Sequence, residues 1–451
     1  MTGVRRVLFR SEEQRARARA AQKKEIIAAS NIDSSRPTRF VGFDHFAASA
    51  IVQDVVKLKD KFAFTLDVSP LYAEMGGQVG DTGEAESNGT IWHIANTQKT
   101  GNTFLHVLSG EDAPAPGAKI ELRVNVPRRA AIQRHHSVTH LLHWALHEVV
   151  SPDAVQKGSY VGPDKLTFDF SSPALTSTQV SDVEKLVNER IVENAPVSWT
   201  EVPYTNVKGR KEIMQFFGEK YGDTVRVVQI GGKPGGLDGY SMELCGGTHT
   251  RATGEVGQFR IVSEGAVAAG IRRIEAVAGL RAYDKTRQDA ALLSSVSARL
   301  NAPVAELEKK IAALLSQQKD LEKQLQSVRQ KQAAEVARGL ASKVQPNGAT
   351  PRIIENLGAA DGDFLQAVAD AIKGQFKGVI VLGGTANDAV SLVASVSPEF
   401  TASYQAGKII QAIAPIVGGK GGGRPDNARG GGKDTGKLDE ALQKAETLLS
   451  K

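Results

Sequence analysis

The sequence predicts an α+β protein of several domains, and three observations support this prediction. The chain has 451 residues, enough for about three domains at the usual 100–200 residues each. The hydrophobic period changes along the chain, from the alternation typical of strands in residues 38–127 to helical spacings of three and four in residues 304–328. The apolar run VIVLGG at residues 379–384 is typical of a fully buried strand in an α/β domain.

The composition is that of a soluble globular protein. Hydrophobic residues make up 41% and charged residues 24% of the chain, and no stretch approaches the roughly 18 uninterrupted apolar residues that a spanning helix needs. The chain does not open with a signal-peptide pattern, and its single cysteine excludes an internal disulfide. We therefore expect a cytoplasmic protein with no membrane partner. The net charge of +6 suits a polyanionic partner without demanding one.

The first two segments are predicted to be an N-terminal tail with a helix, at residues 1–37, and a β-barrel-like domain, at residues 38–127. Residues 1–11 show no usable period and are set aside from the fold prediction, whereas residues 12–30 are rich in Ala, Arg, Lys and Glu, which favours an exposed helix. In residues 62–68 and 120–126 apolar side chains alternate with smaller or polar ones, as half-buried strands require. The glycine-rich loop YAEMGGQVGDTG lies between them.

Three further segments complete the predicted organisation. Residues 128–283 mix a helix at 128–150 with alternating strands, which predicts an α+β domain. Residues 284–345 are predicted to form a helical hairpin or coiled-coil arm, because apolar side chains repeat there at heptad-like spacings; the alternative is an ordinary amphipathic helix packed on a domain. The repeating residues are Val304, Leu307, Ile311, Leu314, Leu321, Leu325 and Val328. Residues 346–451 predict a compact α/β domain in which a glycine-rich loop, GGKGGGRPDNARGGG, precedes a closing helix.

Two short motifs predict a metal site. In RHHSVTHLLHWALH, His136 and His140 stand four residues apart on a predicted helix, so their imidazoles share one face. In CGGTH, Cys245 and His249 are separated by two glycines and a threonine. Zinc takes imidazole nitrogen and thiolate sulfur in a tetrahedral arrangement, and these two pairs would supply four such ligands.

Other interpretations of these motifs remain open. A histidine-rich helix can be half-buried with each imidazole hydrogen-bonded to a neighbour, and a cysteine is often inert core. No glutamate follows His136 in the HExxH position, which disfavours the mechanism of a zinc protease.

The same motifs, in order, resemble those of a known family. HSVTH and CGGTH, together with QKGSYVGPDKLTFDFS, YAEMGGQVGDTG, FFGEKYGDTVRVV and AAGIRRIEAV, resemble the editing domain of alanyl-tRNA synthetases and the related free-standing editing proteins. The resemblance covers residues 12–282, and GGKGGGRPDNARGG resembles the C-terminal domain of the same enzymes.

The resemblance implies that the chain is similar to the C-terminal portion of such a synthetase, bearing its editing and tRNA-binding parts. The class II catalytic core and the helical tRNA-binding domain do not fit before Glu12, so no aminoacylation is expected from this chain alone. A natural trans-acting editing protein and a truncated synthetase would both have this sequence pattern.

The implied reaction is hydrolysis of the ester in Ser-tRNA(Ala) or Gly-tRNA(Ala), with Zn²⁺ as cofactor. Such a second site is needed because a pocket for alanine rejects the smaller glycine by only about 1–3 kcal/mol and rejects an added hydroxyl weakly. Thr139 is the candidate for recognising the serine hydroxyl; the alternative is a helical threonine bonded to its i−4 carbonyl. Gln156 is the candidate for orienting the ester or its attacking water. Four protein ligands would leave zinc no open position, which favours anchoring of substrate over activation of water.

Binding of tRNA(Ala) is expected to use cationic side chains together with glycine backbone N–H groups. The candidates are Arg272, Arg273, Lys420 and Arg424, with Lys208, Arg210, Lys211 and Lys433 as further cations. A homodimer through the C-terminal region is a further expectation.

Two rival functions are considered. In the first, zinc is structural and the chain is a tRNA-binding module without hydrolytic activity. In the second, the C-terminal domain belongs to a DHH-type phosphoesterase, which needs an Asp-His-His motif; the nearest string here, at residues 134–136, begins with Arg134, which disfavours this function.

Overall fold

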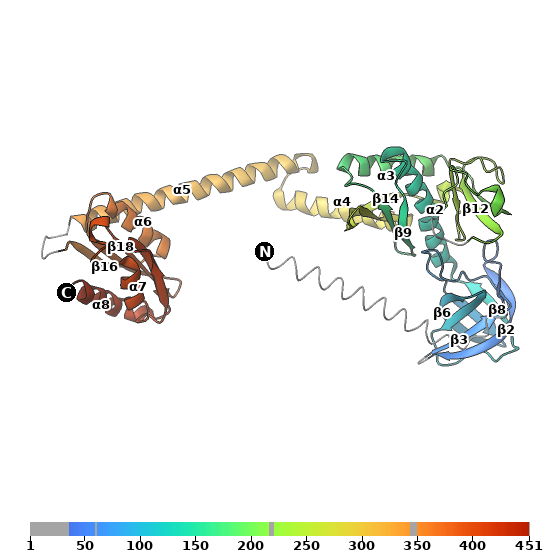
Figure 1. Ribbon diagram of the computed structural model, residues 1–451, viewed down its shortest axis with the longest axis horizontal. Helices are drawn as coiled ribbons and strands as arrows, with labels where there is room; N and C mark the ends of the chain where they lie inside the picture. The colour runs from blue at the N-terminus through green and yellow to red at the C-terminus, as the bar shows by residue number, and fades with distance from the viewer. Residues whose placement is uncertain (1–35, 59–60, 216–220, 343–349, 451) are drawn as a thin grey trace. The chain divides into compact units, whose positions relative to one another are not determined.

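The computed structural model describes residues 36–58, 61–215, 221–342 and 350–450. The chain divides into two compact units, Met1–Leu293 and Ser294–Lys451 (Figure 1). The helix predicted for residues 12–30 lies outside the described residues. The prediction of a mixed α and β protein with several parts and a small barrel is confirmed.

The barrel of the first unit closes through six strands within the described residues, in the order β2-β3-β7-β6-β5-β8 (Figure 1). Its sequence alternation matches its burial: along β8, every second residue points into the core, which Phe64, Leu66, Ile94 and Leu122 fill. The strands are β2 (Ala47–Leu58), β3 (Lys61–Leu66), β5 (Gly83–Ser87), β6 (Thr90–Thr100), β7 (Thr103–Leu108) and β8 (Lys119–Val124), beside a short parallel pair of β1 (Arg39–Phe40) and β4 (Val68–Ser69).

The rest of the first unit packs two antiparallel sheets around helix α2 (Val126–Val149). This helix begins at Asn125, whose side chain accepts a hydrogen bond from the Arg128 amide, and Pro127 occupies its first turn. Helix α3 (Ser177–Val192) begins with a capping box between Thr176 and Gln179. In the core, the buried side chains of Phe168, Phe170 and Phe259 pack together with the apolar side chains of these two helices.

The first of these sheets has the order β14-β15-β10-β9 and the second the order β11-β12-β13. Their strands are β9 (Gln156–Val161), β10 (Leu166–Ser171), β11 (Val197–Pro203), β12 (Thr224–Ile230), β13 (Ser241–Leu244), β14 (Phe259–Ala268) and β15 (Ile271–Ala278), with single 3-10 turns η1 (Tyr204–Asn206) and η2 (Thr253–Val256).

A buried arginine fixes helix α2 to the barrel. The Arg129 side chain is fully buried and donates to the carbonyls of Gly42, at 2.7 Å, and Pro70, at 2.9 Å. It also pairs with the buried carboxylate of Asp81, which lies in the glycine-rich loop YAEMGGQVGDTG. Since Arg129 lies two turns before His136 on the same helix, this pair sets where the helix meets that loop.

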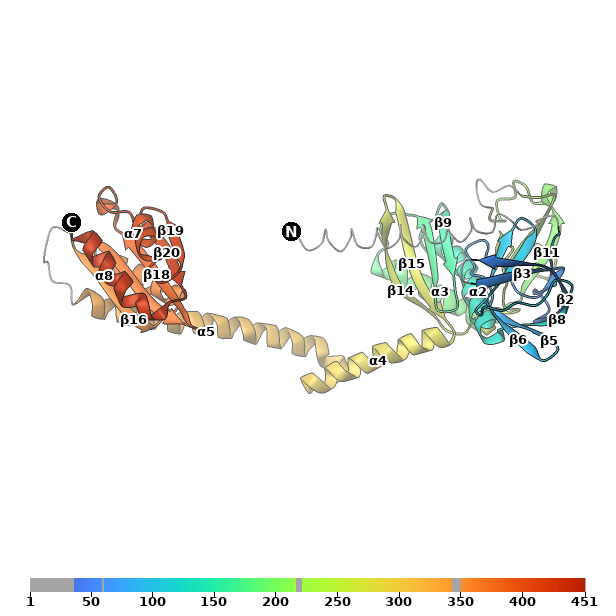
Figure 2. The same cartoon turned by 90° about the horizontal axis from the view of Figure 1, so that it is seen from below.

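The second unit contains a five-stranded sheet with the order β16-β17-β18-β20-β19. Consecutive residues of β17 face opposite sides: Val379 and Val381 pack with helices α7 and α8, whereas Ile380 and Leu382 pack with α6 and the end of α5 (Figure 2). The predicted buried strand at residues 379–384 is therefore covered on both faces. The strands are β16 (Arg352–Ala359), β17 (Val379–Ala386), β18 (Ala389–Val396), β19 (Lys420–Gly423) and β20 (Asn427–Gly432), and the helices are α5 (Leu307–Ala341), α6 (Gly362–Lys373), α7 (Ala406–Ile413) and α8 (Leu438–Leu449), with 3-10 turns η3 (Val304–Glu306), η4 (Pro398–Phe400) and η5 (Thr435–Lys437).

The glycine-rich segment predicted as a loop is a β-hairpin, so that prediction was wrong. Strands β19 and β20 pair antiparallel from Lys420 opposite Gly431 to Gly423 opposite Ala428. The glycines are required because α7 packs directly on this hairpin: a Cβ added at Gly421 or Gly430 would lie 2.4 or 2.6 Å from Cγ2 of Ile410. Glycine is therefore needed here because a helix packs closely on the strands, and not because the segment forms a flexible turn.

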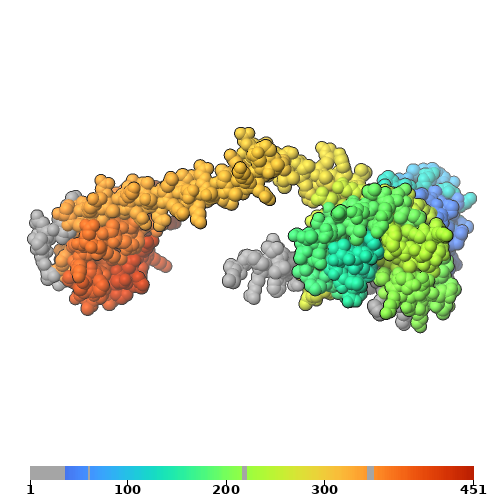
Figure 3. All heavy atoms as spheres, turned by 90° about the horizontal axis from the view of Figure 1, so that it is seen from above, coloured from blue at the N-terminus to red at the C-terminus, as the bar shows by residue number. Residues whose placement is uncertain are grey.

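The helical segment departs in part from the predicted arm. Helix α4 (Leu280–Leu300) crosses the division between the units, and α5 carries most of the apolar repeat. On α5, Ala333, Ala337 and Leu340 pack against the sheet domain, as an amphipathic helix would. The repeat before them is 42–57% exposed at Ile311, Leu314, Leu321, Leu325 and Val328, and Figure 3 shows this segment open on the face in view. The coiled-coil arm therefore stays a prediction.

Within the part of the chain that the structure describes, no helix is long and apolar enough to cross a membrane.

Candidate metal centre

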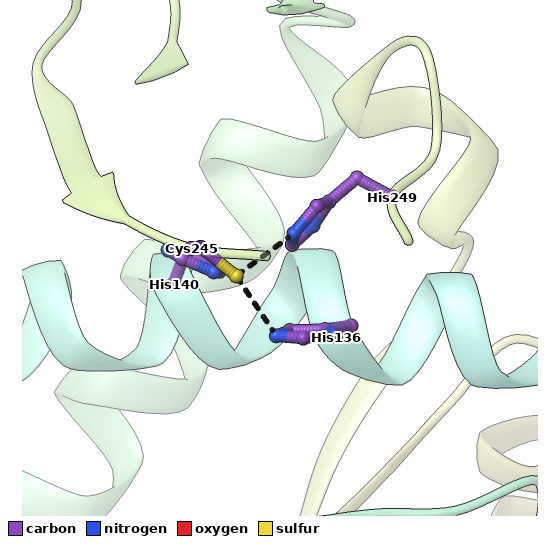
Figure 4. Close-up of side chains that lie close together, drawn as sticks. All are labelled: His136, His140, Cys245 and His249. Carbon is purple, nitrogen blue, oxygen red and sulfur yellow. Dashed lines mark hydrogen bonds between the residues drawn. The ribbon is translucent and has the colours of Figure 1, made fainter. Parts of the chain in front are cut away.

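The structure brings the four predicted ligands together. One ligand atom from each of His136, His140, Cys245 and His249 lies within 4.8 Å of the others (Figure 4). The two helical histidines come from the same face of α2, and the other two residues from the segment that follows β13. Cys245 Sγ lies 3.4 Å from Nε2 of His136 and 3.3 Å from Nε2 of His249. Residues 109 positions apart thus share one centre, which could hold a metal ion.

Each imidazole is oriented by a contact of its other nitrogen. Nδ1 of His136 lies 2.7 Å from Oε1 of Gln78, and Nδ1 of His249 lies 3.2 Å from the Ser137 hydroxyl. Nδ1 of His140 lies 3.1 Å from the carboxylate of Glu243. Because all three Nδ1 atoms are engaged, the three Nε2 atoms are left for the shared centre.

The oriented side chains are tied to one another. Oε1 of Gln78 also accepts from the Thr248 amide, at 2.9 Å, and its Nε2 donates to the Thr248 hydroxyl, at 3.0 Å. The Ser137 hydroxyl accepts from the Thr250 amide at 3.0 Å. The other oxygen of Glu243 accepts from Nδ1 of His143 at 2.8 Å. The barrel loop, helix α2 and the CGGTH segment are therefore held in one hydrogen-bond network.

Burial and charge shift the pKa values of this cluster in different directions. Burial alone would raise the pKa of the Cys245 thiol, but His136 and His249 outweigh it and lower this pKa well below its usual range. Burial lowers the pKa of His249 to about 3. Burial opposes the protonation of His140, yet the Glu243 carboxylate raises its pKa to about 10. The lowered pKa of Cys245 favours the thiolate, the form that binds metals.

The two glycines of CGGTH have different roles. A Cβ added at Gly247 would lie 2.0 Å from Cε1 of His136 and 2.9 Å from Oε1 of Gln78, so only glycine lets the chain pass this ring. At Gly246 the nearest atom would be the flexible end of Met75, at 3.4 Å. Neither residue has a positive φ, so close approach rather than backbone conformation requires glycine at position 247.

A cleft of about 1420 Å³ opens over the centre. Thr139 and Gln156 both line it, but Thr139 also donates its hydroxyl proton to the His135 carbonyl at 2.7 Å. The alternative considered for this residue, an i−4 hydrogen bond within the helix, is thus present. Gln156 begins strand β9 and is half-buried.

The predicted cationic contacts are found in two kinds of environment. Arg272 makes a paired contact with Glu264, at 2.6 Å for Nη2, and Arg273 does the same with Asp169, at 2.6 and 2.7 Å. These two guanidinium groups are therefore already neutralised by cross-strand carboxylates. The exposed cations of the second unit are less constrained: Lys420 starts an edge strand, and Arg424 is 78% exposed beside Asp426 at 3.4 Å.

The remaining cations flagged in the sequence differ in position. Arg210 and Lys211 line the cleft, and Arg210 pairs with Glu212 at 2.7 Å. Lys208 and Lys433 are exposed.

The sequence analysis missed the residues that orient the ligands. Gln78 lies in the glycine-rich loop YAEMGGQVGDTG, which the motifs did not connect with the metal site, and Glu243 lies two residues before the cysteine. The signal that could have found Glu243 is its spacing, because it lies two residues before Cys245 at the end of strand β13 and is an acidic residue beside a predicted ligand. No local pattern links Gln78 to a histidine 58 residues away.

Comparison with known proteins agrees with the motifs. A model of the threonyl and alanyl tRNA synthetase second additional domain matches residues 225–275, which include Cys245 and His249. A DHHA1 domain model matches residues 352–451. A model of class II (A) tRNA synthetases matches residues 4–128, and thus includes most of the first eleven residues, which show no period in the sequence.

The relatives cover nearly the whole chain. An alanine--tRNA ligase of Opitutus terrae is 41% identical over 458 residues, covering 98% of this chain and 48% of the relative. An alanine--tRNA ligase of Hydrogenovibrio crunogenus is 40% identical over 445 residues, covering 96% of this chain and 50% of the relative. The chain belongs to the alanine--tRNA ligase family. It spans about half the length of these relatives and resembles their C-terminal portion.

Among solved structures, a domain of a synthetase is similar to part of the chain. The C-Ala domain of Aquifex aeolicus alanyl-tRNA synthetase is 27% identical, with a TM-score of 0.23, covering 24% of this chain and 99% of that domain.

Proposed function

We propose that this chain is the editing and tRNA-binding part of an alanine--tRNA ligase, and that it hydrolyses the ester of Ser-tRNA(Ala) and Gly-tRNA(Ala) with zinc at the His136, His140, Cys245 and His249 centre. The observation that supports this most is the convergence of three imidazoles and one cysteine sulfur beside a large cleft. Membership of the family supplies the substrate class.

The donor set fits zinc by its geometry and chemistry. Tetrahedral zinc, with bonds of roughly 2.3 Å to sulfur and 2.0–2.1 Å to nitrogen, separates sulfur from nitrogen by about 3.6 Å. The distances from Cys245 Sγ to Nε2 of His136 and of His249, 3.4 and 3.3 Å, are close to this value. A mixed imidazole and thiolate set suits zinc better than the hard cations magnesium and calcium, which prefer oxygen.

Zinc held by these four side chains would act as an electrostatic anchor for the aminoacyl ester. The selectivity comes from the chain's own residues. The Thr139 hydroxyl gives its proton to the His135 carbonyl, so towards the cleft it can only accept a hydrogen bond. A serine hydroxyl can donate to that oxygen, whereas bound alanine or glycine would leave it unpaired at a cost of about 1–3 kcal/mol, so this contact favours the seryl ester alone.

Gln156 has the second role in this proposal. Its amide lies at the wall of the cleft, at the start of β9, where it can both donate and accept hydrogen bonds. We assign it to orient the ester carbonyl or the attacking water.

The tRNA would be held by exposed cations. Lys211 in the cleft and Lys420 and Arg424 on the glycine-rich hairpin are exposed and could contact phosphates, whereas Arg210 is half-buried and already pairs with Glu212. Arg272 and Arg273 would have to give up their carboxylate partners to bind phosphate, which makes their predicted role the weaker part of this proposal.

The test uses the purified chain with Ser-tRNA(Ala), Gly-tRNA(Ala) and Ala-tRNA(Ala). We expect deacylation of the first two and little of the third. Thr139→Val should slow seryl ester hydrolysis by about 10-fold or more with less effect on glycyl ester, because only serine uses the hydroxyl contact. Gln156→Ala should slow both.

Absence of hydrolysis, with tRNA binding and bound zinc retained, would establish the alternative of a zinc-containing tRNA-binding module. Sedimentation analysis of the same preparation tests the proposed homodimer through the C-terminal region.

A further inference from the structure

Arg226, on strand β12, is hydrogen-bonded to the backbone of the ligand-bearing CGGTH segment. Its Nη1 donates to the Cys245 carbonyl at 3.0 Å and to the Gly247 carbonyl at 2.7 Å. In return, the Cys245 amide donates to the Arg226 carbonyl at 3.1 Å. One side chain therefore spans the turn that separates the thiolate from His249.

The guanidinium of Arg226 is held by aromatic rings. Its Cζ lies 4.0 Å from the centre of the Phe43 ring and 4.5 Å from that of Trp199. Arg251 packs on the same Trp199 ring at 4.2 Å and donates to the Phe43 carbonyl at 3.1 Å. Within the described residues Arg226 has no ion-pair partner, and its buried Nε and Nη2 have no hydrogen-bond partner. A guanidinium buried in this way needs an explanation, because buried polar groups are normally paired.

We infer that Arg226 is a positioning residue for the metal centre: its Nη1 group, held by Phe43 and Trp199, fixes the Cys245–Gly247 turn so that the thiolate faces the histidines of α2. This inference rests on the proposed zinc site. The two N–H bonds of Nη1 point in fixed directions within the guanidinium plane, so they set the separation of the two carbonyls. A lysine ammonium on a flexible stem carries the same charge but does not define such a plane.

The aromatic contact extends this positioning to the barrel. Phe43 lies in the segment that leads into β2, and the carbonyl of the preceding Gly42 accepts from Arg129 of α2. The Phe40 ring contacts Phe43 edge-on, with centroids 4.8 Å apart. The metal-binding turn is thus tied to the same barrel segment that docks the helix carrying the other two ligands.

The experiment compares Arg226→Lys with a matched control, Arg190→Lys. Arg190 also packs on two aromatic rings of the first unit, Trp144 at 4.9 Å and Tyr240 at 5.1 Å, but among the described residues its side chain is hydrogen-bonded to Glu193 and not to the ligand turn. Zinc affinity is measured by competition with a chromophoric chelator, and the ligand geometry by the visible spectrum of the cobalt-substituted protein.

We expect Arg226→Lys to bind zinc 10- to 100-fold more weakly than the unchanged protein and to alter the cobalt spectrum, as loss of an orienting contact does in other metal sites. The zinc affinity of Arg190→Lys should stay within about twofold of that of the unchanged protein. Equal zinc affinity and an identical cobalt spectrum for Arg226→Lys would overturn the inference while leaving the proposed function standing. If the unchanged protein binds no zinc, the proposed function fails first.

A second variant covers the case in which Arg226→Lys does not fold. Phe43→Leu keeps both Nη1 hydrogen bonds and removes one ring, and we expect a weakening of zinc binding of about three- to tenfold with an intact thermal transition. If Phe43→Leu binds zinc as tightly as the unchanged protein, the proposal that the aromatic rings hold Arg226 in position is wrong.

Discussion

Replacement of Gly247 by alanine tests the proposed metal centre most directly. The added Cβ would lie 2.0 Å from Cε1 and 2.3 Å from Nδ1 of His136. Carbon atoms normally stay about 3.5–4.0 Å apart, so the ring or the turn must move by roughly 1.5 Å. Zinc sites tolerate only about 0.2 Å in their bond lengths. His136 or Cys245 must therefore leave the ligand set.

We expect zinc affinity to fall by about 100-fold or more in Gly247→Ala, equivalent to roughly 3 kcal/mol of binding free energy. Gly246→Ala is the control, because it makes the same chemical change one residue away, where the new methyl group meets only the flexible end of Met75. It should bind zinc within about threefold of the unchanged protein. Competition with a chromophoric chelator measures all three proteins, and circular dichroism confirms that each is folded.

The reasoning is wrong if Gly247→Ala binds zinc as tightly as the unchanged protein. It is also wrong if Gly246→Ala weakens binding as much as Gly247→Ala, since the effect would then come from backbone freedom rather than from contact with His136.

Three further predictions concern stability. Burial lowers the pKa of His106 from 6.5 to about 4, so between these pH values the unfolded chain binds a proton that the folded barrel does not. The free energy of unfolding should therefore fall by about 3 kcal/mol as the pH falls from 6.5 to 4. His106→Gln should reduce this loss, measured by urea denaturation of the metal-free protein. Asp81→Ala should lower the free energy of unfolding by about 3–5 kcal/mol because it leaves the fully buried Arg129 without its counter-charge, and adding Arg129→Met should restore part of it. Gly430→Ala should cost about 1–3 kcal/mol through its contact with Ile410, and in a double-mutant cycle Ile410→Ala should reduce that cost; simple additivity of the two changes would contradict the packing argument.

Local patterns identified the ligand candidates but not what surrounds them. Two histidines four apart on a helix must share a face, so His136 and His140 could be paired from the sequence. The sequence places two glycines between Cys245 and His249, yet only the tertiary structure shows that Gly247 meets the His136 ring and that Gly246 meets no rigid neighbour. Glu243, which orients His140, was not recognised.

The two units show where periodicity succeeds and where it misleads. Alternation in residues 120–124 identified the barrel strand β8 because one face of this strand is buried, but Val126, at the end of the same alternation, is exposed and begins helix α2. The glycine-rich segment of the second unit was taken for a loop, although α7 packs on it and makes Gly421 and Gly430 necessary in a paired hairpin. The apolar repeat of α5 predicted a partner helix. Such a repeat shows that one face of the helix is apolar, but it does not show what packs on that face.

The sequence by itself determined the chemical identities and the short-range geometry of this protein: the ligand types, their spacing within each motif, and the strand and helix periods, because these depend on backbone geometry over a few residues. The tertiary structure alone decided that a thiolate meets imidazoles 109 positions away, and that Gln78, Ser137 and Glu243 turn those rings towards it. Contacts of that kind depend on how the barrel loop, α2 and the segment after β13 pack together, and no local pattern encodes the distance between them.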